Sequence, residues 1–183
     1  MTTERKDVYI KAMSVVEGDQ DGVFFLYGYG GTGKTFVQKT LSVALRSKGD
    51  IVLTIASSVI AFLPLPGDRT AHSTFGIPLN PNEDTICNIK QGSPLAELIV
   101  KTKLIIWAEV PMVNIYCFEA LDRIIRDILS FSNPLNLEQP FGGKTIVFGG
   151  DFVRFCLSFQ KEVGKILCLQ LLTPYTYGYI VKF

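Results

Sequence analysis

The chain is poor in the residues that most protein metal centres use. Among its 183 residues there is one histidine, His72, and there are four cysteines. No two cysteines stand in the Cys-x-x-Cys spacing of zinc and redox sites, so most zinc schemes are excluded. We expect the cysteines to be buried thiols in a reducing compartment; they are Cys87, Cys117, Cys156 and Cys168.

Long apolar runs and a charge excess are also missing. No apolar stretch approaches the roughly 20 residues that a membrane-spanning helix needs, and no apolar signal core follows the polar first residues. The net charge of +1 gives no argument for nucleic acid. Because hydrophobic residues make up 48% and charged residues only 19%, the chain either buries much of itself or exposes an apolar surface that a partner would cover. We expect one soluble, intracellular domain with no membrane contact.

The chain does have a glycine-rich segment, Gly-Tyr-Gly-Gly-Thr-Gly-Lys-Thr, at residues 28–35. It matches the pattern G-x-x-x-x-G-K-[ST], in which glycines let backbone N–H groups surround phosphate oxygens. In this pattern Lys34 reaches the β- and γ-phosphates, and the Thr35 hydroxyl holds Mg²⁺. The competing interpretation is a glycine-rich turn with a surface lysine. The predicted nucleotide-binding residues are Gly28, Gly30, Gly31, Thr32, Gly33, Lys34 and Thr35.

Strand and helix patterns alternate along the chain. Short apolar runs predict buried strands at 23–27, 51–55, 104–107 and 145–148. Helical spacing of apolar residues predicts helices at 2–16, 35–46, 93–99 and 116–129, while 70–92 and 134–143 are expected to be irregular. Strands that are apolar throughout and alternate with helices indicate a parallel α/β sheet. Residues 166–169 and 179–181 are further strand candidates.

Carboxylates follow two of the predicted strands. NTP hydrolysis on such a sheet usually needs an aspartate that positions Mg²⁺ and an adjacent glutamate that activates water. The third strand runs into Ala108-Glu109, so Glu109 is the predicted general base, but alanine stands at the aspartate position and cannot ligate a metal. Asp151 follows the fourth strand and is predicted to approach the γ-phosphate. An exposed loop carboxylate at Glu109 and a turn or capping residue at Asp151 are the alternatives.

Several blocks of residues, in the same order, resemble the first motor domain of the petite-integration-frequency helicases of helicase superfamily one. The resemblance runs from about residue 8 to residue 152. The blocks are residues 26–35, 56–58 with 60–61, 67–73, 105–112, 118–122, 141–144 and 149–152.

This resemblance implies a RecA-like P-loop domain, a parallel sheet flanked by helices, over residues 1–152. Residues 153–183 would form a divergent tail, and the second motor domain would be absent, leaving a single incomplete motor domain. The family uses ATP and Mg²⁺ to move five-prime to three-prime on single-stranded DNA, in repair, recombination and telomere maintenance. A nuclear location is implied, with the mitochondrion as the alternative.

The resemblance also assigns roles to single residues. Residues 30–35 would bind ATP and Mg²⁺, and Glu109 would activate water. Four residues, at two sites, would face single-stranded DNA, through hydroxyl contacts to phosphates and rings that stack on bases. For His72 the alternative is a turn residue bonded to nearby backbone. The four residues are Ser57, Ser58, His72 and Phe75.

Three positions depart from the family pattern. Ala108 replaces an aspartate, Arg5 replaces a glutamine that reads adenine, and Val153-Arg154 replace an Arg-Gln pair whose glutamine senses the γ-phosphate. Motors of this class bind ATP between two domains and move by closing them. We therefore expect ATP binding with weak or no unwinding by this chain alone, unless another chain supplies the second motor domain. A non-catalytic ATP- or DNA-binding remnant and a small-molecule P-loop kinase are the alternative functions.

Overall fold

The computed structural model describes residues 3–18, 20–28, 31–57, 69–110, 114–150 and 178–182. Helices and strands alternate along most of these residues, as the sequence predicts. In chain order the elements are α1 (Thr3–Glu17), β1 (Val23–Tyr27), α2 (Lys34–Ser47), β2 (Ile51–Ala56), β3 (Arg69–Thr70), α4 (Ala71–Phe75), α5 (Pro94–Lys101), β4 (Thr102–Ala108), α6 (Ile115–Ser130), the 3₁₀ turns η2 (Pro134–Leu137) and η3 (Pro140–Gly143), β5 (Thr145–Gly150) and β6 (Gly178–Lys182).

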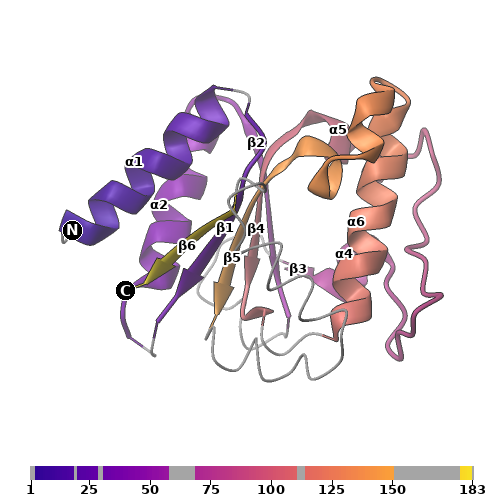
Figure 1. Ribbon diagram of the computed structural model, residues 1–183, viewed down its shortest axis with the longest axis horizontal. Helices are drawn as coiled ribbons and strands as arrows, with labels where there is room; N and C mark the ends of the chain where they lie inside the picture. The colour runs from indigo at the N-terminus through magenta and orange to yellow at the C-terminus, as the bar shows by residue number, and fades with distance from the viewer. Residues whose placement is uncertain are drawn as a thin grey trace.

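One sheet of six strands organises the described residues. Its strand order is β3-β2-β4-β5-β1-β6, and every neighbouring pair is parallel. Helices α1 and α2 cover one face, and α4, α5 and α6 lie on the other (Figure 1). The predicted parallel α/β sheet with flanking helices is therefore confirmed. No helix in these ranges is both long enough and apolar enough to cross a membrane.

The two covered faces explain why the strands are apolar throughout. Successive side chains of a strand point to opposite faces of the sheet. In β4, Leu104 and Ile106 belong to the core beneath α1 and α2. Ile105 and Trp107 belong to the core beneath α4, α5 and α6. With apolar layers on both sides, a polar residue in the middle of β4 would have no water to face.

The helices bury one face each. In α6 the apolar residues at helical spacing are all buried, namely Phe118, Leu121, Ile125, Ile128 and Leu129. In α2 the buried face includes the polar residues Gln38 and Ser42, whereas Phe36 is half exposed. A sequence pattern that counts only apolar residues misses such polar residues on an inner face.

The region expected to be irregular contains two short elements, β3 and α4. The Oγ1 of Thr70 accepts a hydrogen bond from the backbone N–H of Ser73 at 3.2 Å, which caps α4. Gly76, with φ of 63°, ends the helix after five residues. A helix this short has no apolar periodicity for a sequence analysis to detect. The strand predicted at 179–181 is confirmed within β6, whereas 166–169 lie outside the described residues.

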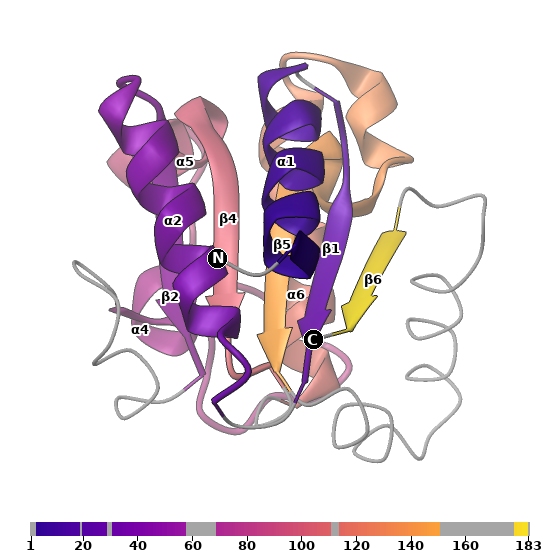
Figure 2. The same cartoon turned by 90° about the vertical axis from the view of Figure 1, so that its left-hand side faces the viewer.

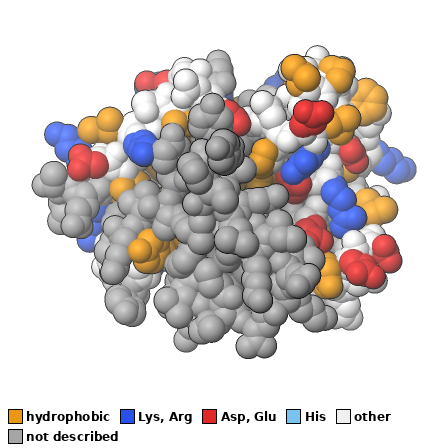
Figure 3. Space-filling model, viewed as in Figure 1, with side chains coloured by type: hydrophobic (Ala, Val, Ile, Leu, Met, Phe, Trp, Pro, Cys, Tyr) orange, Lys and Arg blue, Asp and Glu red, His pale blue; other side chains and the backbone are white. Residues whose placement is uncertain are grey.

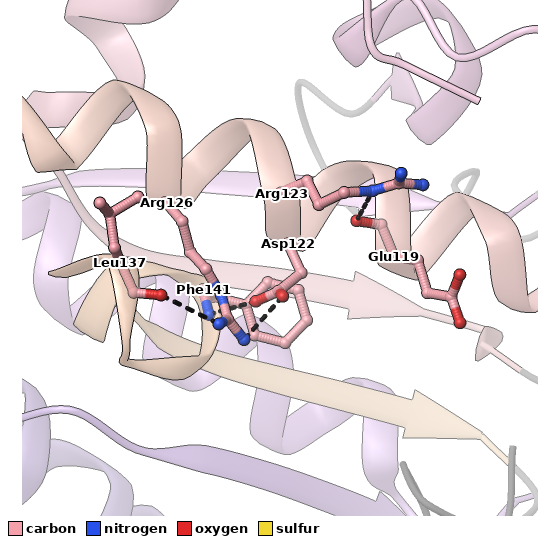
Figure 4. A network of polar contacts seen from close by, with 6 residues as sticks. All are labelled: Glu119, Asp122, Arg123, Arg126, Leu137 and Phe141. Carbon is pink, nitrogen blue, oxygen red and sulfur yellow. Dashed lines mark hydrogen bonds and ion pairs between the residues drawn. The ribbon is translucent and has the colours of Figure 1, made fainter. Parts of the chain in front are cut away.

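Polar contacts connect α6 to the 3₁₀ turns that precede β5 (Figure 4). A carboxylate oxygen of Asp122 accepts a hydrogen bond from the backbone N–H of Phe141 at 2.6 Å, and its other oxygen pairs with Arg126 at 2.7 Å. Arg126 also donates to the carbonyl of Leu137 at 3.1 Å. Because φ of Phe141 is 51°, an unfavourable value for a non-glycine residue, these contacts hold a strained turn in place.

Exposed apolar side chains follow the end of α6. Phe131 and Leu135 are largely exposed, and Leu137 is about half exposed. Figure 3 shows hydrophobic side chains gathered on this side of the molecule, over the end of α6 and the turns after it. The low charge content thus corresponds both to a sheet buried on two faces and to some apolar surface.

Candidate nucleotide-binding site

The phosphate-loop pattern lies between β1 and α2, as predicted. Gly31 and Gly33 adopt left-handed φ values of 81° and 93°, which glycine reaches without steric cost. Gly33 is the N-cap residue of α2. Tyr29 and Gly30 lie outside the described residues. The strand, the loop glycines and the helix thus stand in the arrangement that the pattern requires.

The first turn of α2 differs from that of the neighbouring helices. Helices α4, α5 and α6 are each capped by a side-chain oxygen, from Thr70, Ser93 and Asn114. Gly33 offers α2 no such side chain, and the first turn of α2 contains no acidic residue. Its N–H groups and the positive end of its dipole therefore suit an external anion.

Lys34 and Thr35 begin α2 at this position. The Nζ of Lys34 donates to the carbonyl of Gly28 at 2.5 Å, so the side chain spans the loop from its last residues to its first. Both side chains are partly exposed. The ammonium and the backbone N–H groups fit a chain of phosphates, and the Thr35 hydroxyl is a suitable oxygen ligand for Mg²⁺.

Glu109 follows β4 in a strained backbone conformation. Its φ is 55°, and its side chain is exposed. The Oγ of Ser57 donates to the Glu109 carbonyl at 2.6 Å, and the Ser57 N–H donates to the Ala108 carbonyl at 3.2 Å. Strained residues held by neighbouring contacts concentrate at functional sites. Ser57 therefore fixes the turn that carries the predicted general base.

Parallel strands bring these segments to one edge of the sheet. The loop follows β1, Ser57 follows β2 and Glu109 follows β4, and Figure 2 shows the strand arrowheads pointing to this common edge. In the strand order β5 separates β4 from β1. At about 4.8 Å per strand, Glu109 starts roughly 10 Å from the loop. Asp151 follows Gly150 of β5 directly in sequence, but it lies outside the described residues.

Few of the described residues at this edge are suitable metal ligands. Across the described ranges no group of three or more His, Cys, Asp or Glu residues is arranged to hold a metal ion. Ala108 is nearly buried and presents only a methyl group. The described residues thus fit the phosphates well, but for Mg²⁺ they offer the Thr35 hydroxyl and, at the end of β4, the Glu109 carboxylate.

The predicted DNA-facing residues have different outcomes. Phe75 is 0% exposed in the core that also contains Trp107, so the prediction that its ring stacks on bases is wrong. The Nδ1 of His72 lies 3.1 Å from the carbonyl of Ile77, which is the backbone contact of the alternative interpretation. Ser57 uses its hydroxyl hydrogen within the Glu109 turn. Ser58 lies outside the described residues.

Two described cysteines are buried thiols, as expected. Burial raises the pKa of Cys87 to about 12 and, with a smaller opposing effect of a backbone hydrogen bond, that of Cys117 to about 11. Both thiols therefore stay protonated at neutral pH and are poor nucleophiles. Cys156 and Cys168 lie outside the described residues.

One contact of the loop had no signal in the sequence. The Nη2 of Arg5, in the first turns of α1, donates to the carbonyl of Thr32 at 2.6 Å. The sequence marks Arg5 only as a departure from a family pattern. It gives no indication that α1 would place this guanidinium against the phosphate loop, 27 residues further along the chain.

Comparisons with known proteins agree with this geometry. The family model described as PIF1-like helicase matches residues 1–167. The chain is 32% identical over 145 residues to the ATP-dependent DNA helicase PIF1 of Emericella nidulans and 31% identical over 142 residues to the ATP-dependent DNA helicase PIF4 of Trypanosoma brucei brucei. These matches cover 76% and 75% of this chain but only 18% and 17% of the relatives.

Solved structures give the same result. The fold matches Pif1 helicase from Bacteroides in complex with ADP-AlF3 and single-stranded DNA, with a TM-score of 0.68 and 26% identity, over 99% of this chain and 41% of that one. Unliganded Pif1 from Bacteroides sp. matches with a TM-score of 0.62 and 29% identity, over 82% of this chain and 31% of that one. The sheet and its helices therefore form a RecA-like domain of the Pif1 type, and the chain belongs to the PIF1-like helicase family.

Proposed function

We propose that this chain binds ATP through residues 28–35 as the first motor domain of a DNA helicase. The observation that carries the proposal is the geometry of the loop. Gly31 and Gly33 have left-handed backbones, α2 begins without a side-chain cap, and Lys34 spans the loop. The relatives named above are ATP-dependent DNA helicases, which supports a helicase motor domain as the setting of this loop.

In this proposal Thr35 would hold Mg²⁺, which would supply charge neutralisation of the phosphates. Lys34 binds the β- and γ-phosphates, and Glu109 accepts a proton from the attacking water. Asp151 is proposed to contribute to the γ-phosphate region. Because Ala108 supplies no carboxylate, we propose that turnover by this chain is slow even where binding is tight.

Single-stranded DNA is the proposed partner at the same edge of the sheet. Among the described residues, the exposed Ser73 of α4 and the partly exposed His72 and Ser57 are the groups that we propose for contacts with the DNA backbone. Ser58 is proposed with them from the sequence alone. Closing on DNA needs a second motor domain, in the same protein or from another chain. Roles in repair, recombination and telomere maintenance, and a nuclear or mitochondrial location, stay predictions.

The decisive experiment is titration of a fluorescent ATP analogue with and without Mg²⁺ and single-stranded DNA. We expect saturable binding that Mg²⁺ strengthens and that Lys34→Ala weakens by about 100-fold, because the ammonium is the main side-chain contact of the phosphates. Lys39→Ala, a charge change on α2 outside the loop, is the matched control. No binding by the folded wild-type protein would refute the proposal.

The second candidate function is a non-catalytic ATP- or DNA-binding remnant. Ala108 favours it, because the metal-positioning carboxylate is missing. ATP hydrolysis by the wild-type chain, measured beside Lys34→Ala, separates the two functions: brisk turnover that Lys34→Ala abolishes excludes the remnant. The third possibility, a small-molecule kinase, has no support from the relatives, which are helicases.

A further inference from the structure

The contact between Arg5 and the phosphate loop has a defined geometry. The guanidinium donates to the Thr32 carbonyl at 2.6 Å. It also lies flat against the next residue, because a Cβ built on Gly33 would stand 2.6 Å from the Cζ of Arg5 and 2.8 Å from its Nε and Nη2. Any side chain at residue 33 would displace the guanidinium. The φ of 93° favours glycine at residue 33, and any larger residue there would also cost the Arg5 contact.

The Thr32 carbonyl and the Gly33 N–H belong to one peptide unit. A trans peptide is planar, and its C=O and N–H bonds point in opposite directions. A donor that holds the carbonyl on one side of the loop therefore aims the N–H to the other side. In a phosphate loop the N–H groups must point at the phosphates and the carbonyls away from them.

We propose that Arg5 is a positioning residue for phosphate binding. By holding the Thr32 carbonyl it orients the Gly33 N–H toward the phosphates of the nucleotide. The side chain acts on the loop from α1, so the helix before β1 and the loop after it form one binding unit. This inference rests on the proposed function of the loop as the ATP site.

The neighbouring charges make this arrangement specific for a polyanion. Arg5 and Lys34 place two cations beside the N-terminus of α2, whose first turn has no acidic residue. Two cations next to the positive end of a helix dipole repel one another and the dipole. A polyanion bound at the loop relieves this repulsion, whereas an uncharged base would not.

The test measures affinity for a fluorescent ATP analogue and, by competition, for inorganic tripolyphosphate, which has no base. Arg5→Met removes the donor but keeps the aliphatic stem, and we expect about tenfold weaker binding of both ligands. Arg5→Lys, which restores a donor, is expected to recover most of the loss. Arg46→Met removes the same charge and a similar backbone contact, to the Val52 carbonyl, at the far end of α2, and is expected to bind as wild type does.

Two outcomes would overturn the positioning role while leaving the ATP site intact. One is unchanged tripolyphosphate affinity in Arg5→Met together with weaker ATP binding, which would make Arg5 a contact of the base. The other is a loss that disappears between about 0.05 and 0.5 M KCl, because salt screens a direct charge effect but not the orientation of a peptide. Failure of the wild type to bind either ligand would refute the proposed function and this inference together.

Folding is controlled separately. The thermal unfolding midpoint of each variant is measured without ligand, so that an affinity loss at an unchanged midpoint is assigned to the loop. Arg5→Ala is the second removal variant if Arg5→Met does not fold, because alanine is the best helix former and makes no packing demand. Wild-type affinity in a folded Arg5→Ala protein would also overturn the inference.

Discussion

The phosphate loop and the end of β4 lie at the same edge of the sheet but are unequally equipped. The loop has its two left-handed glycines, its lysine and its threonine, and Arg5 braces it from α1. The end of β4 has a strained glutamate held by Ser57 and an alanine in place of the expected aspartate. In the proposed function, binding and hydrolysis are therefore separable, since the first depends on backbone geometry and the second on carboxylates.

The largest effect is expected from Gly33→Ala, which changes the phosphate loop. An alanine there must adopt φ of 93° and also displace the Arg5 guanidinium. We expect affinity for the ATP analogue to fall by about 100-fold or more, equivalent to about 2.7 kcal/mol. Gly31→Ala is the control, because Gly31 lies in the same loop with a similar φ of 81° and has no atom within 4 Å of an added Cβ. Equal binding losses in the two variants would show that strain alone acts, without Arg5.

The next largest effect is expected at the end of β4, where alanine stands in place of the expected aspartate. Ala108→Asp restores a carboxylate beside Glu109 and is expected to raise Mg²⁺-dependent ATP turnover by at least about tenfold, because a positioned metal stabilises the developing charge. Steady-state phosphate release measures it. Ala108→Asn, which has the same shape without the charge, is expected to stay near the wild-type rate. If the asparagine variant is equally fast, the missing carboxylate is not what limits turnover.

A smaller effect is expected when the hydrogen bond between Ser57 and Glu109 is removed. Ser57→Ala removes the 2.6 Å hydrogen bond to the Glu109 carbonyl, and we expect the free energy of unfolding to fall by about 1 kcal/mol. Chemical denaturation measures this change. Ser47→Ala, which removes an exposed hydrogen bond to the Ala44 carbonyl, is the comparison and should change stability less. A greater loss in Ser47→Ala would contradict the bracing role.

The smallest effect tests the strain directly. Glu109→Gly relieves the left-handed backbone at φ of 55° and is expected to stabilise the protein by about 0.5–1 kcal/mol, after the entropic cost of glycine. Glu109→Gln keeps the strain and should leave stability unchanged. Both variants are expected to lose any residual ATP turnover and to keep wild-type affinity for the analogue. Destabilisation by glycine would mean that the turn is not strained.

Local sequence patterns were sufficient to predict the strands of the sheet and the longer helices. Apolar runs such as 23–27 and 104–107 identify strands because a sheet covered on both faces buries most of its side chains. The spacing of Phe118, Leu121 and Ile125 identifies α6 for the same reason of burial. The apolar pattern gave no signal for α4, which is only five residues long, or for Gln38, a polar side chain on the inner face of α2.

At the candidate site, too, local patterns predicted some features and packing decided the others. The sequence by itself determined the fold class and the place of the loop between β1 and α2, because apolar strand runs and glycine-rich turns are local patterns. The nucleotide chemistry of the loop stays a proposal. Only the tertiary structure decided that Phe75 is core rather than surface, that Ser57 holds Glu109, and that Arg5 holds Thr32 across 27 residues. Each of these contacts depends on packing that brings together residues far apart in the sequence. No local residue pattern indicates which distant residues will meet.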